Sequence, residues 1–120
     1  MSDEGRPQDL EERTYEFARD VRAFVKELPK TEGNAEDVPQ LLRASGSVAA
    51  NYIEANDGLG KKDFLMRARI SRKEAKESAL FLRLVDCGGD SRLEDVRAGL
   101  LNEAKELKLI LSAIIRNSGG

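Results

Sequence analysis

The chain has 120 residues, of which 40% are hydrophobic, 35% charged and only 5% aromatic, and its formal net charge at pH 7 is −2. This length suits one domain with a single core, and the scarcity of aromatic residues and proline favours long charged helices over a β-sandwich. No stretch approaches the ~20 apolar residues of a membrane span, and the acidic N-terminus does not resemble a signal peptide. We therefore expect a cytoplasmic protein with no membrane partner.

The first expected helix covers residues 9–28 and follows a flexible tail at residues 1–8. Acidic residues such as Glu11 and Glu12 stand in its first turn, where negative charge favours the positive end of the helix dipole, and Pro29 ends the pattern. Its apolar residues recur three and four positions apart, as expected for an amphipathic helix, at Leu10, Phe17, Val21, Phe24, Val25 and Leu28.

The pair Gly33-Asn34 predicts a turn, and Pro39 suggests the entry of a second helix over residues 37–55. This helix is rich in small residues, including Gly46, which costs roughly 1 kcal/mol against alanine in a helix interior. We expect close packing against neighbouring helices to compensate for that cost.

Two further helices are expected at residues 61–87 and 91–117, separated by Gly88-Gly89 and followed by a frayed terminus at 118–120. Asp90 or Ser91 can cap the last helix. Four amphipathic helices joined by short connections favour an antiparallel, up-down-up-down four-helix bundle. The predicted fold class is therefore all-α.

The third and fourth helices carry more apolar residues than one core requires. A helix that is apolar on two faces needs two partners, which favours a homo-oligomer; isolated apolar residues are nevertheless common on protein surfaces, so that alternative stays open. The candidate interface residues are Met66, Ile70, Phe81, Leu109, Ile110 and Ala113.

Residues 61–83 contain eight basic and three acidic side chains, whereas residues 1–40 contain six basic and eleven acidic ones. A basic ridge on one side of the third helix could follow a phosphate backbone of RNA or DNA. It could equally be a solvated face, or pair with the acidic first helix of the same or a neighbouring subunit, since the pI of about 5.3 is low for a dedicated nucleic-acid binder. The ridge consists of Lys62, Arg69, Arg72, Lys73, Lys76 and Arg83.

Catalytic motifs are missing from the sequence. It has no histidine and a single cysteine, Cys87, so a zinc site built on thiolates and a histidine general base are both excluded. No phosphate-binding glycine loop or nucleophile elbow occurs. We expect no enzyme activity and no catalytic residue, metal or cofactor, and we interpret Cys87 as a small apolar residue near a helix end.

Residues 40–55, QLLRASGSVAANYIEA, resemble the signature of the four helix bundle protein family, also called 23S rRNA-intervening sequence proteins. The segments 62–64 (KDF), 73–78 (KEAKES) and 81–84 (FLRL) are similar to its second half, and 10–18 is similar to its beginning. Two mild departures are Ala44, where the family often has serine, and Leu80-Phe81, where a Tyr-Trp pair is common.

The resemblance implies a bundle that forms homopentamers and whose genes were noticed inside insertions in bacterial large-subunit rRNA genes. A related group, the accessory proteins of diversity-generating retroelements, is similar in fold and is thought to bind a reverse transcriptase and nucleic acid. We therefore expect a non-enzymatic homo-oligomer of the intervening-sequence type; the alternative is a nucleic-acid-binding accessory protein, with rRNA or a reverse transcriptase as partner.

Five polar residues of the family motif suggest a seam between the second and third helices, in which Arg43 or Asn51 meets Glu74 or Glu77. Such a seam would set the register of the bundle. We favour this structural role over a ligand site for Arg43, Asn51, Glu54, Glu74 and Glu77.

Overall fold

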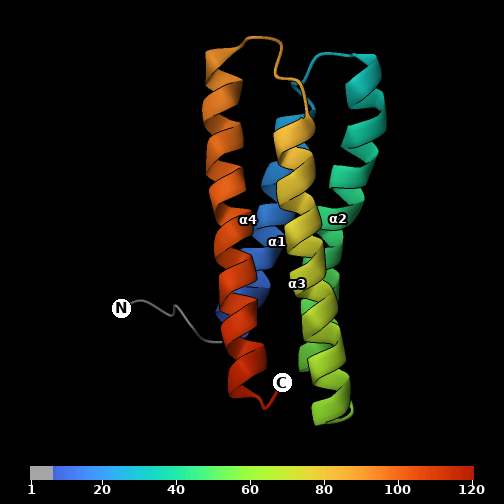
Figure 1. The fold of residues 1–120 in the computed structure, drawn as a ribbon, viewed down its shortest axis with the longest axis vertical. Coiled ribbons are helices and arrows are strands. Elements are labelled where there is room, and N and C mark those ends of the chain that lie inside the picture. Colours follow the sequence, from blue (N-terminus) through green and yellow to red (C-terminus); the bar gives the residue numbers. More distant parts are fainter. Residues whose placement is uncertain (1–6) are drawn as a thin grey trace.

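The structure is a computed structural model that describes residues 7–120, and these residues form four helices and no strand (Figure 1). The helices are α1 (Pro7–Val25), α2 (Glu32–Asn56), α3 (Lys61–Leu84) and α4 (Ser91–Asn117). Most of the expected tail at residues 1–8 lies outside the described residues, and Pro7 and Gln8 already belong to α1. None of the described helices is long and apolar enough to cross a membrane.

The helices lie side by side around one core. Within residues 7–120, α1 lies next to α2 and α4, and α3 lies next to the same two helices, whereas no Cα atom of α1 lies within 8 Å of one of α3. The α2–α3 connection lies at one end of the molecule, and the α1–α2 and α3–α4 connections lie together at the other end (Figure 1). The contact between α1 and α4 is the least extensive of the four.

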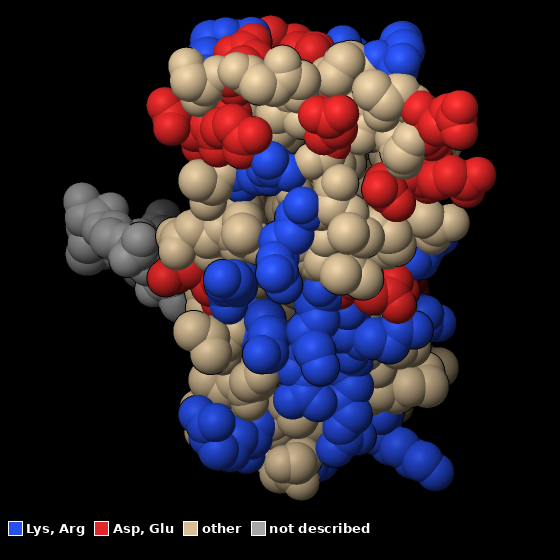
Figure 2. Space-filling view, turned by 45° about the horizontal axis from the view of Figure 1, so that its top comes forward, with Lys and Arg blue, Asp and Glu red and all other residues tan. Residues whose placement is uncertain are grey.

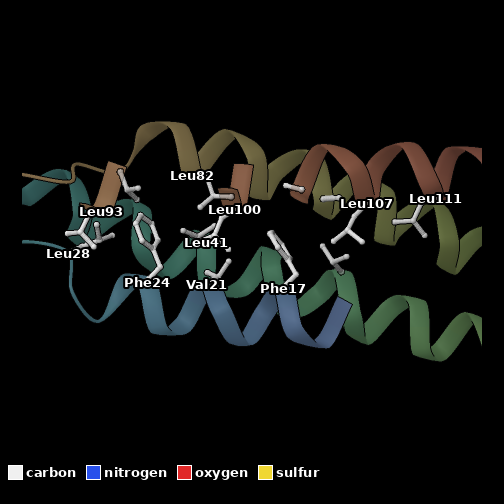
Figure 3. Close-up of a cluster of buried hydrophobic side chains, with 14 of the residues drawn as sticks. Phe17, Val21, Phe24, Leu28, Leu41, Leu82, Leu93, Leu100, Leu107 and Leu111 are labelled. Atoms are coloured by element: carbon white, nitrogen blue, oxygen red, sulfur yellow. The ribbon is translucent and has the colours of Figure 1, made fainter. Parts of the chain in front are cut away.

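The main core is largely aliphatic, with Phe17, Phe24 and Tyr52 as its aromatic side chains, and all four helices contribute to it (Figure 3). Burying each large apolar side chain contributes roughly 1.5–3 kcal/mol. The apolar residues expected on one side of the first helix are buried, except for Val25, which is partly buried. The largest buried apolar side chains are Phe17, Val21, Phe24, Leu41, Val48, Tyr52, Leu82, Leu107 and Leu111.

Helix α2 begins at Glu32, five residues before the expected start at 37, so the turn predicted from Gly33-Asn34 is wrong. Thr31 is the N-cap: its hydroxyl accepts a hydrogen bond from the backbone N–H of Asn34 at 3.0 Å. This bond satisfies one of the free N–H groups of the first turn, which allows the helix to start before Gly33. Pro39 lies inside the helix on its exposed side.

The C-terminal ends of α1 and α3 also differ from the expected ones. Helix α1 ends at Val25 and α3 at Leu84, three residues earlier than expected in both cases. Val85 is extended, and the Arg97 guanidinium of α4 donates to the carbonyl oxygens of Leu82, Arg83 and Val85, so a cation occupies the negative end of α3. The expected frayed end is instead a turn: the N–H groups of residues 118–120 bond to carbonyls of α4, with Gly119 at φ +88°.

Close approach of α2 and α3 depends on small residues, as expected from the composition of the second helix. The hydroxyl of Ser71 on α3 donates to the carbonyl oxygen of Val48 on α2 at 2.7 Å, and both residues are fully buried. Ala44, Ala68 and Ala75 are also fully buried. Such short side chains let the two helices pack closely along their lengths.

Candidate functional site

Arg43 of α2 joins two carboxylates of α3. Its Nη1 lies 3.3 Å from both carboxylate oxygens of Glu74, and its Nη2 lies 2.6 Å from Oε2 of Glu77. The Glu74 side chain is only 6% exposed, whereas that of Arg43 is 50% exposed. The two carboxylates raise the pKa of Arg43, with the Glu77 hydrogen bond as the largest cause and the Glu74 bond next. Arg43 therefore supplies the countercharge for a buried carboxylate.

The other two seam residues lie apart from this cluster. Asn51 donates to the carbonyl and hydroxyl oxygens of Ser47 on its own helix, and its side-chain oxygen accepts a bond from Arg67 of α3 at 3.3 Å. Glu54 is exposed and pairs with no side chain among the described residues. The side chain–side chain polar contacts between α2 and α3 thus form two separate groups, Arg43 with Glu74 and Glu77, and Asn51 with Arg67.

The six residues of the basic ridge all lie on α3, five of them exposed and Arg72 partly buried. None has a carboxylate within ion-pair distance among residues 7–120. The helices α1 and α3 are diagonal in the bundle, and no ion pair joins the ridge to the acidic first helix among the described residues of this subunit. The ridge cations are therefore not neutralised by ion pairs within residues 7–120.

A shallow hollow lies at the centre of the ridge. Arg69, Arg72, Lys73 and Lys76 line it together with Glu77 and Leu80. Glu77 already contacts Arg43, so its charge is partly compensated from the other side. Four neighbouring cations around a hollow suit a phosphate group chemically.

Charge is unevenly distributed along the long axis. Figure 2 shows basic side chains gathered over the half where α3 begins, and acidic ones around the opposite end. Residues 61–76 contain seven basic and two acidic side chains, whereas the segments 26–37 and 86–97 together contain eight acidic and four basic ones. The net charge of −2 therefore conceals a basic end and an acidic end.

The candidate interface residues fall into two groups. Met66 and Leu109 are exposed, Leu109 to 65%, while Ile70 and Ala113 are partly buried. Phe81 and Ile110 are also partly buried and pack against the core of their own chain. Sequence analysis missed two other exposed side chains on α3, Leu80 and Leu84, although both lie on the same side of the helix as Met66.

Arg22 was also missed by sequence reasoning. Its guanidinium donates to the carbonyl oxygens of Ala18 and Leu42 and to the hydroxyl of Ser45. It lies over Gly46, where a Cβ would come within 3.1 Å of Nη2. The absence of a side chain at Gly46 thus makes room for an arginine that joins α1 to α2.

The described residues hold no cluster of three acidic or cysteine side chains close enough to share a metal ion. Fold and surface together define a small all-α protein whose distinguishing features are an Arg–Glu contact between α2 and α3 and a charged α3 surface. A sequence model described as 23S rRNA-intervening sequence protein matches residues 8–113. The chain belongs to this family.

One solved structure is similar over almost its whole length, a protein of unknown function from the S23 ribosomal protein family of Bacteroides thetaiotaomicron VPI-5482. The two chains are 25% identical with a TM-score of 0.76, and the match covers 92% of this chain and 97% of that one. The comparison with curated proteins gives no match.

Proposed function

We propose that the protein is a non-enzymatic assembly protein, an antiparallel four-helix bundle whose copies associate into a homopentamer. The observation that carries the proposal is a line of apolar side chains left on the outside of α3. Met66, Leu80 and Leu84 are each about half exposed. Partly buried Ile70 lies four residues after Met66, and Leu84 lies four residues after Leu80, so these residues form two apolar pairs on one side of the helix. Lys73 and Glu77 lie between the two pairs on the same side. A row of this kind is typical of a helix that packs against a second partner.

Sedimentation equilibrium and native mass spectrometry test this proposal. At micromolar concentrations the expected species contains five 13.3 kDa chains. A monomer over the whole concentration range would overturn the proposal, and a stable assembly of another size would overturn the pentamer alone. Met66→Lys should weaken the assembly. Lys61→Ala, at an exposed position on another side of the same helix, is the control for a change outside the apolar row.

The second candidate function is nucleic-acid binding through the basic ridge. It is supported by the six ridge cations, which have no ion-pair partner among the described residues, and by the hollow that Arg69, Arg72, Lys73 and Lys76 line. Each phosphate contact releases counterions, so the logarithm of the binding constant should fall linearly with the logarithm of salt concentration, with a slope of about −0.9 per contact on duplex DNA.

The test is fluorescence anisotropy with labelled RNA and DNA between low and physiological salt. Arg72→Gln should weaken binding and flatten the salt slope by about one unit. The matched control is Lys26→Gln, an exposed cation at the acidic end. Absence of binding at low salt would show that the ridge is a solvated face.

A further inference from the structure

A groove with an acidic rim runs between α1 and α4, the two helices whose mutual contact is least extensive. Buried Phe17, Phe24 and Leu100 form its apolar base. Five carboxylates surround this base, and three of them have an ion-pair partner in the same chain. Arg13 holds Glu103 by two bonds at 2.7 and 2.9 Å, while Arg19 pairs with Asp20 and Arg92 with Glu27. Glu16 and Asp95 have no ion pair among the described residues. The rim carboxylates are Glu16, Asp20, Glu27, Asp95 and Glu103.

The wall that α4 contributes to this acidic groove is open. A Cβ built at Gly99 would meet no atom within 4 Å, and Val96 beside the groove is exposed. Glycine in a helix interior is unfavourable by roughly 1 kcal/mol against alanine, and here no contact within the chain compensates for it. The groove therefore has room for side chains that approach the backbone of α4 from outside.

The same chain presents a surface of opposite character at the end of α3. Lys76 and Arg83 are exposed cations, and Leu80 and Leu84 are exposed apolar side chains between and beside them. We call these four residues the α3 end face. A basic, partly apolar helix surface is the chemical complement of an apolar groove with an acidic rim.

The two surfaces lie at the same height along the molecule. Arg97 of α4 bonds to the carbonyl oxygens that end α3, so the first turns of α4 lie beside the last turns of α3. Both helices rise 1.5 Å per residue, so the groove wall from Asp95 to Glu103 lies at the same height along the bundle as roughly residues 76–84 of α3. Since α1 and α3 are diagonal in the bundle, the groove and the end face are on different sides of one chain and can be occupied together.

We propose that the acidic groove of one copy binds the α3 end face of the next copy, with Leu80 and Leu84 on the apolar base and Lys76 and Arg83 among the rim carboxylates. This inference rests on the proposed self-association and names the surfaces that produce it. An interface between two different surfaces of identical chains is heterologous, and it gives a closed ring when the rotation between neighbours closes. In a closed ring, neighbouring copies are related by rotation without a shift along the axis. The two surfaces that meet must therefore lie at the same height, as the groove and the α3 end face do.

The first test fills the groove without disturbing the fold. Gly99→Gln adds a flexible side chain where the isolated chain has open space, and Ala98→Gln is the matched control at the next, exposed position outside the groove. We expect both variants to keep the helix content of the parent by circular dichroism. In sedimentation velocity, Gly99→Gln should raise the dissociation constant of the assembly at least tenfold, and Ala98→Gln should leave it unchanged.

The second test reverses charge on each surface. Replacing Lys76 and Arg83 with glutamate should raise the dissociation constant of the assembly at least tenfold. Replacing Glu16 and Asp95 with lysine in that same chain should restore it, because the two surfaces again carry opposite charges. Assembly should also weaken as salt is raised, since these charges are near the surface.

The outcomes separate this inference from the proposed function. If the parent protein is a monomer, both are wrong. If it assembles and Gly99→Gln assembles equally well, or charge reversal at Lys76 and Arg83 has no effect, the groove is not the interface, although self-association stands. Loss of assembly with Gly99→Gln, together with rescue by the four-residue charge exchange, is the expected result.

Discussion

Asn34 of α2 donates a hydrogen bond to the carbonyl oxygen of Asp86 at 2.9 Å and accepts one from its backbone N–H at 2.8 Å, although the two residues are 52 positions apart. The same amide donates to the carbonyl oxygen of Pro29. Through these hydrogen bonds Asn34, which is 4% exposed, links the α1–α2 connection to the residues that follow α3. One side chain satisfies three backbone groups that have no helix partner.

Asn34→Ala should lower the free energy of unfolding by about 1–3 kcal/mol, because it removes three part-buried hydrogen bonds to the backbone of Pro29 and Asp86. Urea unfolding followed by circular dichroism measures the change. Asn102→Ala, at an exposed position of α4, is the control and should stay within about 0.5 kcal/mol of the parent. Equal midpoints for the two variants would show that solvent replaces the Asn34 bonds.

Arg43→Ala should lower the free energy of unfolding, measured by urea unfolding, by about 1–3 kcal/mol, because it leaves the buried Glu74 carboxylate without its countercharge. The loss should be below the ~3–5 kcal/mol typical of a fully buried pair, since Arg43 is itself half exposed. Lys73→Ala on the ridge should remain within about 0.5 kcal/mol of the parent. An Arg43→Ala protein that melts like the parent but loses a binding partner would make this contact a recognition site.

Gly99→Ala should raise the free energy of unfolding of the monomer by about 0.5–1 kcal/mol, because it improves helix propensity and its Cβ enters open space. Gly88→Ala is the contrasting variant. Gly88 has φ +66°, and a Cβ there would lie 3.2 Å from Cγ of Pro29, so this change should destabilise the fold by about 1 kcal/mol or more. Thermal melts at the same protein concentration compare the two variants, and opposite signs are expected.

The Cys87 thiol should react with an aromatic disulfide reagent far more slowly in the folded than in the unfolded protein. It is only 2% exposed, and burial raises its pKa while Arg97 opposes the shift. Fast, stoichiometric labelling of the folded protein would contradict this.

The same raised pKa implies a pH dependence. The folded state holds the thiol proton more tightly than the unfolded state, so the stabilisation is complete below the ordinary thiol pKa and is lost as pH rises through the raised value. The unfolding free energy of the parent, minus that of Cys87→Ala, should therefore decrease over this alkaline range. A difference that is constant with pH would show that the thiol titrates equally in both states.

The sequence by itself was sufficient for the all-α fold class and for most of the core, because apolar residues such as Phe17, Val21 and Leu107 repeat with the helical period. The family signature could also be recognised from the sequence, because residues 40–55 are contiguous and lie in one helix. Helix ends were less predictable: Thr31 caps α2 through its side chain, and this bond overrides the turn tendency of Gly33-Asn34.

Only the tertiary structure decided which polar residues meet. The sequence places Arg43 and Asn51 in one helix. Only the packing of α2 on α3 brings Arg43 to Glu74, and Asn51 to Arg67. The Asn34–Asp86 contact and the acidic groove likewise join segments far apart in the sequence. Periodicity records which face of a helix is apolar, whereas contacts between helices depend on their packing in three dimensions, which no local pattern specifies.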